Sequence, residues 1–198
     1  MAAPPRPVSV FPRVAFRVAV AATLIFSLVI FHIQHQEVAR QAAPTPLDVL
    51  MAAQRGDGGW AVSGEQPRPQ YDVAVTALAV LALIQSGPAP LDEPLAPALR
   101  AGVDFLIRTQ NRDGQFGPAF SGLKFTQYLA AKALGAAADL PDADPAWQTA
   151  ALRARERMPA EHQMVALNRQ LAQPQSFPGN WADAGGPAVQ AALELLKR

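Results

Sequence analysis

The chain contains two kinds of apolar stretch, and they alternate along the sequence. Residues 47–54 and 95–110 are amphipathic, as expected of helices with one buried face. The apolar face of the second stretch holds Leu95, Leu99, Val103 and Leu106. Residues 73–84 and 128–138 are apolar nearly all round, which is typical of a helix buried on both sides. The pattern predicts an all-α domain whose half-exposed and fully buried helices form an outer and an inner layer.

The last third of the chain continues this pattern less regularly. Met158 and Pro159 break the next amphipathic segment into helices over 146–157 and 160–171. A final apolar helix is predicted over 187–198. The sequence therefore predicts about three successive helical hairpins within residues 47–198.

The amino-terminal segment differs from the rest of the chain. Residues 18–31 carry no charge, and counting from residue 14 the apolar stretch is about 18–20 residues, just enough to cross a bilayer. No polar face recurs there, as a buried core helix would require. A cleaved signal peptide is the alternative, but no A-x-A site follows the apolar run. We interpret residues 14–36 as an uncleaved transmembrane anchor.

Basic residues set the expected orientation of this anchor. Arg6, Arg13 and Arg17 precede it, whereas Arg40 is the one basic residue close behind it. The positive-inside rule then predicts a single-pass membrane protein in which residues 1–13 are cytoplasmic. Residues 37–46 are a linker, and the domain over 47–198 lies outside the cytoplasm, in the periplasm if the cell is a Gram-negative bacterium.

Composition excludes several function classes. A net charge of +1 argues against an electrostatic nucleic-acid binder. The chain has no cysteine, which excludes disulfides, thiolate nucleophiles and cysteine-ligated zinc. It also lacks the G-x-S-x-G, Walker, H-E-x-x-H and G-x-G-x-x-G motifs. We therefore expect no metal, no cofactor and no partner among nucleic acids.

Two short segments repeat at an offset of 56 residues. Each ends an amphipathic stretch and holds a glutamine, a glycine after an aspartate, and a closing aromatic ring. The matched residues are Gln54 with Gln110, Gly58 with Gly114, and Trp60 with Phe116. A third, degraded copy retains Trp181 before the final apolar helix.

The second copy and the helix before it carry a longer pattern. It consists of a basic and a small residue, an aromatic and an aliphatic one, then the glutamine, the glycine and the ring: Arg100, Ala101, Phe105, Leu106, Gln110, Gly114 and Phe116. This pattern resembles the QW motif of squalene–hopene and oxidosqualene cyclases, with phenylalanine in place of the closing tryptophan. The resemblance covers about residues 45–198 and extends to the β-subunits of protein prenyltransferases. It implies a partial α/α-toroid.

In that motif the repeated residues are structural. The glutamine can bond the backbone of a neighbouring outer helix, while the ring clamps the two outer helices. The enzymes' catalytic groups have no full counterpart here. The nearest string to the cyclases' D-x-D-D cluster runs from Asp142 to Pro145, lacks the last acid and is expected to be turn and N-cap chemistry. The prenyltransferases' zinc site needs a cysteine. We therefore predict no catalytic residues.

Three hairpins are too few to wall a closed cavity, so the arc should remain open or be closed by a second copy or another protein. Both tyrosines, Tyr71 and Tyr128, fall at the beginning of an expected inner helix, and Phe120 and Phe125 lie near the second of them. Such an aromatic rim suits an isoprenoid, lipid or peptide ligand; ordinary packing is the alternative.

The sequence thus predicts a membrane-anchored, noncatalytic domain that binds a partner or an apolar ligand. Two other hypotheses stay open. One is a fragment or subunit of a terpene-cyclase- or prenyltransferase-like enzyme completed by another chain. The other is a structural domain left by gene decay.

Overall fold

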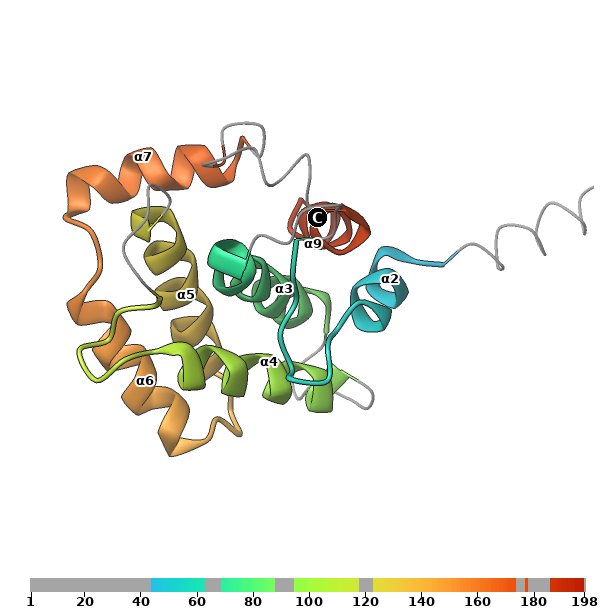
Figure 1. The fold of residues 1–198 in the computed structure, drawn as a ribbon, viewed down its shortest axis with the longest axis horizontal. Coiled ribbons are helices and arrows are strands. Elements are labelled where there is room, and N and C mark those ends of the chain that lie inside the picture. Colours follow the sequence, from blue (N-terminus) through green and yellow to red (C-terminus); the bar gives the residue numbers. More distant parts are fainter. Residues whose placement is uncertain are drawn as a thin grey trace, which may run out of the picture. The chain divides into compact units, whose positions relative to one another are not determined.

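The computed structural model describes residues 44–62, 69–87, 95–117, 123–173, 177 and 186–197 (Figure 1). They belong almost entirely to one compact unit, Thr45–Arg198. The helices of this unit are α2 (Pro46–Ala52), α3 (Asp72–Ser86), α4 (Leu95–Thr109), α5 (Leu123–Ala138), α6 (Pro145–Glu156), α7 (Glu161–Leu171) and α9 (Gly186–Leu195). A short 3-10 helix, η1 (Pro69–Tyr71), precedes α3. The described residues contain no strand, so the all-α class is confirmed.

Local sequence signals explain where two outer helices begin. The hydroxyl of Thr45 accepts a hydrogen bond from the Asp48 backbone N–H at 3.1 Å, and the Asp48 carboxylate accepts one from the Thr45 N–H. This capping box is followed by a proline at the first position of α2. Asp144 caps α6 in the same way, accepting a bond from the Ala146 N–H at 2.8 Å. The predicted N-cap is therefore confirmed.

The predicted break after residue 157 is also confirmed. α6 ends at Glu156 and α7 begins at Glu161, on either side of Pro159. A proline at that position removes a backbone donor and obstructs the preceding turn, so one helix cannot continue through it.

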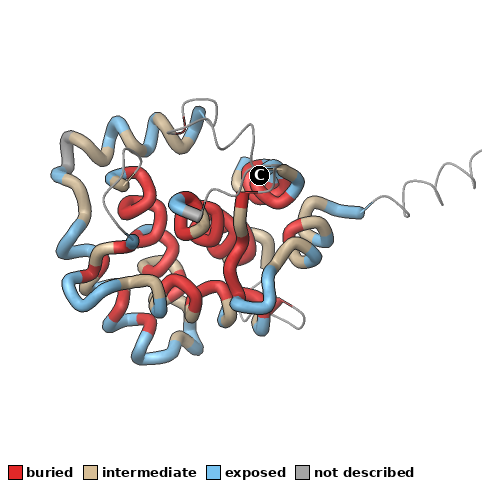
Figure 2. The backbone as a smooth tube through the Cα atoms, viewed as in Figure 1, coloured by how far each residue is buried: buried red, intermediate tan, exposed pale blue. Residues whose placement is uncertain are grey.

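The two all-apolar stretches form the centre of the domain. All residues of α3 from Val73 to Leu83 are buried, and α5 is buried along most of its length (Figure 2). The predicted burial of both helices is confirmed. The start of α5 is corrected, because the helix begins at Leu123 and Tyr128 lies in its second turn.

Helices pack in pairs around α3 (Figure 1). α3 and α5 lie side by side, α4 covers α3, and α6 covers α5. α9 packs on α3 and also on α2. The described residues therefore contain three pairs, each of one more exposed and one more buried helix: α2 with α9, α4 with α3, and α6 with α5.

The position of α9 corrects the expectation of three hairpins in succession. As the inner helix of a third hairpin, α9 would lie next to α5 and extend the row. It packs instead on α3 and α2, where it covers the buried face of α2. The seven-residue α2 has a fully buried leucine, Leu50, and a helix this short needs a packed neighbour to be stable. The α5–α6 end of the row is left to α7.

None of the described helices combines the length and apolar character needed to cross a bilayer. The predicted anchor over residues 14–36 lies outside the described residues.

Candidate functional site

The first motif copy joins the end of α2 to α4. The side-chain amide of Gln54 donates to the carbonyl of Ala98 in α4 at 2.8 Å and to the carbonyl of Gly58 in its own loop at 2.9 Å. The ring of Trp60 is fully buried. A Cβ added at Gly102 of α4 would lie 2.9 Å from this ring, so the ring packs directly on the α4 backbone. The loop is thereby fastened to the next outer helix.

The second motif copy makes the same junction between α4 and α6. Gln110 donates to the carbonyl of Ala150 in α6 at 3.1 Å, and the ring of Phe116 is fully buried. The bond from each glutamine to the neighbouring helix, which the motif predicts, is confirmed in both copies.

Both glycines of the motif are required by close backbone contacts. Gly58 has φ of 83° and Gly114 has φ of 81°, in the left-handed region that favours glycine. A Cβ at Gly58 would lie 2.3 Å from the carbonyl oxygen of Ala101, and one at Gly114 would lie 2.2 Å from that of Arg153. Each loop therefore rests against the backbone of the next outer helix, and the glycine contacts of the two junctions are equivalent.

Polar residues of the inner helices complete these junctions. The Thr76 hydroxyl accepts from the Trp60 N–H at 2.9 Å, and the side-chain oxygen of Gln127 accepts from the Phe116 N–H at 3.2 Å. Gln127 also donates to the carbonyl of Gly114 at 3.0 Å. Our sequence reasoning missed both residues. The signal for them is a polar residue within a largely apolar, buried helix, because such a residue needs a hydrogen-bond partner.

An ion-pair cluster is specific to the first junction. Arg55 contacts Asp57 at 2.5 Å and Asp72 at 2.7 Å. The hydrogen bond to Asp57 is the main cause that raises the pKa of Arg55 and lowers the pKa of Asp57. Burial raises the pKa of Asp72, although Arg55 partly opposes this effect. These contacts order the loop, and among the described residues they bring no third acidic or histidine side chain to it. More generally, no metal-binding group of three such residues occurs in the part of the chain that the structure describes.

The two acids nearest to a cyclase-like motif, Asp142 and Asp144, lie in a turn and in a helix cap. Asp144 caps α6, and Asp142 is exposed in the turn before it. The structure thus places both in the α5–α6 connection, as the sequence predicts.

Three of the four aromatic residues proposed to rim a ligand site lie in the described residues. Tyr71 and Phe125 are buried, and Phe125 packs on Phe177 with ring centroids 4.7 Å apart. Tyr128 lines a cleft that Tyr71 does not line. Phe120 lies outside the described residues, as does Trp181 of the third motif copy.

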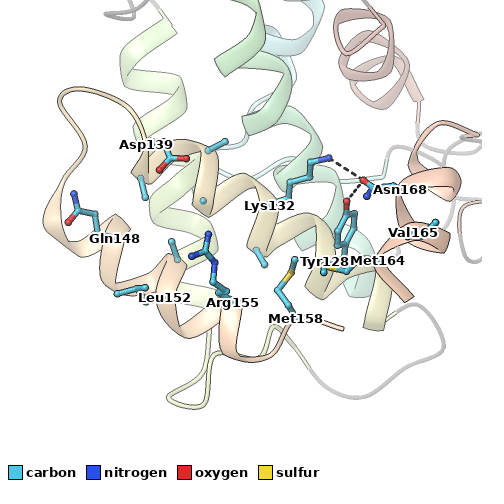
Figure 3. A pocket seen from close by; sticks show the side chains of 15 residues that line it. Tyr128, Lys132, Asp139, Gln148, Leu152, Arg155, Met158, Met164, Val165 and Asn168 are labelled. Carbon is cyan, nitrogen blue, oxygen red and sulfur yellow. Dashed lines mark hydrogen bonds between the residues drawn. The ribbon is translucent and has the colours of Figure 1, made fainter. Parts of the chain in front are cut away.

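The cleft lies between α5, α6 and α7 and has a volume of about 890 Å³ (Figure 3). Small residues of α5 form one wall, and leucine, valine and methionine side chains of the other elements approach it. Its lining residues are Tyr128, Ala131, Lys132, Gly135, Ala136, Ala138, Asp139, Gln148, Ala151, Leu152, Arg155, Met158, Met164, Val165 and Asn168. Leu152 is 61% exposed and Val165 is 59% exposed, and these are the exposed large apolar side chains among the described residues.

One end of the cleft carries a hydrogen-bonded polar group. Tyr128 donates its hydroxyl proton to the side-chain oxygen of Asn168, and Lys132 donates to the same oxygen at 3.4 Å (Figure 3). The Lys132 ammonium also lies 5.7 Å from the centre of the Tyr128 ring. Sequence reasoning picked out Tyr128 but missed the cleft, because its walls come from three separate elements.

The described residues therefore define an all-α protein of paired helices with two equivalent glutamine–aromatic junctions and an apolar cleft at one edge. Comparisons of the chain with family models, curated proteins and solved structures give no match.

Proposed function

We propose that this protein is a noncatalytic, α/α-toroid-like domain that binds an apolar ligand in the cleft between α5, α6 and α7. Residues 14–36 anchor it in a membrane as a single-pass protein, with the domain on the extracytoplasmic side. The observation that carries the proposal is the cleft itself.

The paired helices support the toroid-like assignment. Two motif copies fasten successive outer helices, and the inner helices α3 and α5 pack side by side behind them. This is the arrangement expected of QW-like repeats, so it favours the resemblance to the cyclase and prenyltransferase fold. Because the motif residues hold helices together, they are not available for chemistry on a substrate.

The size and lining of the cleft support ligand binding. Pockets for small molecules typically have volumes of about 300–1,000 Å³ and largely apolar walls with a few polar groups. This cleft, at about 890 Å³, lies within that range, and its lining combines apolar side chains with a few polar ones, including the hydrogen-bonded group at Asn168. Leu152 and Val165 leave apolar surface exposed beside it, and a bound apolar molecule would cover that surface.

Gly135 offers a sharp test, because a Cβ at this position would meet no atom within 4 Å. Gly135→Leu should fill the cleft without disturbing the helix, and Gly135→Ala is its matched control. We expect full-length protein purified from membranes to retain bound apolar molecules in the wild type and the alanine variant. The leucine variant should lose them, as measured by mass spectrometry of the extracted lipids.

An equal lipid content in the two variants would contradict ligand binding in this cleft. Light scattering on the same samples tests the other expected occupant, a second copy of the chain. A dimer that only Gly135→Leu dissociates would make the cleft a protein interface instead.

A further inference from the structure

The polar end of the cleft offers hydrogen-bond donors to a ligand, because the side-chain oxygen of Asn168 is already bonded within the protein. The side-chain oxygen of Asn168 already accepts from Tyr128 and Lys132. An ammonium group can only donate, so the bond from Lys132 fixes which end of the Asn168 amide is the oxygen. The amide's NH₂ group is then a donor left for a ligand.

One cation accompanies this amide. Lys132 of α5 donates to Asn168, whereas Arg155 lies farther along the cleft and points from α6 toward α5 (Figure 3). The ion pairs recorded among the described residues all belong to Arg55, so neither cation is neutralised by a carboxylate there. The one acid that lines the cleft, Asp139, follows Lys132 by seven residues, or about 10 Å along a helix axis.

The cleft surface between Lys132 and Asp139 includes small and apolar side chains. On α5 it consists of Ala131, Gly135 and Ala138, whose small side chains leave space along the helix. Leu152 of α6 and Met158 beyond it also line this surface. Methionine adapts its shape readily to a flexible apolar chain.

We infer that the ligand is a single long-chain carboxylate. Its carboxylate group accepts from Lys132 and the Asn168 amide, and its hydrocarbon chain lies over Gly135. This inference rests on the proposed function and adds the chemistry of the head group, through complementarity with an end that offers one cation and one amide donor.

A photoreactive probe series tests the inference on the full-length protein in phosphatidylcholine nanodiscs. Three probes share one long diazirine-bearing chain and end in a carboxylate, an alcohol or an amine. After illumination, mass spectrometry locates the labelled peptides. We expect the carboxylate probe to label the segments that line the cleft, with competition by oleate, and the amine probe to label them least.

Charge variants give the matched comparison. Lys132→Met keeps an apolar stem but loses the cation, and it should reduce carboxylate labelling of the cleft by about fivefold. Lys197→Met, on an exposed residue away from the cleft, should leave it unchanged. Labelling by the alcohol probe should be insensitive to both changes.

The outcomes separate the head-group inference from the binding function. If the alcohol and carboxylate probes label the cleft equally, and the charge variants change neither, the carboxylate inference is wrong while apolar binding stands. If no probe labels the cleft and Gly135→Leu has no effect on any of them, both the inference and the proposed function fail.

Discussion

Adding one methyl group to a motif glycine should damage the domain more than any ordinary glycine substitution. Gly114→Ala places a Cβ 2.2 Å from the carbonyl oxygen of Arg153, whereas real Cβ contacts are essentially never closer than 3.0 Å. The loop and α6 must therefore separate by at least 0.8 Å, the difference of these two distances. Neither contacting atom lies on a side chain that could simply rotate away.

Three contributions set the magnitude. A left-handed backbone costs a non-glycine residue about 1 kcal/mol. Overpacking against a fixed neighbour costs about 1–3 kcal/mol. Separation of α6 also weakens the bond from Gln110 to Ala150, which is worth about 1 kcal/mol. We expect Gly114→Ala to lower the free energy of unfolding by about 4 kcal/mol, and Gly58→Ala to lower it similarly because its contact with Ala101 is equivalent.

Urea unfolding followed by circular dichroism at 222 nm measures this effect, and two glycines provide controls. Gly117 has φ of 68° but open space around its Cβ position, so Gly117→Ala should lose about 1 kcal/mol from backbone strain alone. Gly135 lies inside α5 in open space, so Gly135→Ala should gain about 1 kcal/mol from helix propensity. The reasoning is refuted if Gly114→Ala is no more destabilising than Gly117→Ala.

Three further measurements test the roles assigned above. Trp60→Ala should lower the free energy of unfolding by about 3–5 kcal/mol and Trp60→Phe by much less, and an unchanged melting temperature in the alanine variant would exclude a clamping role. Asp144→Ala should cost about 1 kcal/mol through the lost cap, whereas a larger loss would mean that this carboxylate has another partner. Hydrogen bonds to Thr45 and to Arg55 lower the pKa values of Asp48 and Asp57, respectively. The free energy of unfolding should therefore fall below pH 3.8, the ordinary pKa of aspartate, as these two carboxylates become protonated. Asp72 acts in the opposite sense, because burial raises its pKa and its protonation above pH 3.8 favours the folded state. Asp72→Asn should therefore abolish any rise in stability between neutral pH and pH 4. The same variant should keep the fall in stability below pH 3.8.

Periodicity predicted the helices well because most of them bury a defined face. The outer helix expected over 95–110 is observed as Leu95–Thr109, and the helix expected over 73–84 as Asp72–Ser86. The start of α5 was missed because Lys124 and Gln127 interrupt the apolar run. Gln127 is nevertheless buried, since its amide is used in the second junction. A tertiary contact there overrides the polarity pattern.

The placement of α9 could not be predicted from its sequence. An apolar helix with burial on several sides has no single face that specifies its neighbour, so it can pack wherever an apolar surface is left open. α2 and α3 together leave such a surface, and α9 packs on it. The cleft follows from the same fact, because α9 is not at the α5–α6 end and the half-exposed α7 lies there instead.

The two junctions also explain why a fixed repeat offset describes this chain incompletely. From each glutamine to its acceptor carbonyl the chain advances 44 residues in the first junction and 40 in the second. The motif copies are 56 residues apart, but the acceptors Ala98 and Ala150 are 52 apart. Within each receiving helix the spacing is constant, since the glycine contact lies three residues after the acceptor in both. The connecting segments absorb the four-residue difference. The two junctions therefore share the pair of contacts rather than the period, and a degraded copy such as that at Trp181 is better sought by a glutamine and a glycine that can meet one helix face.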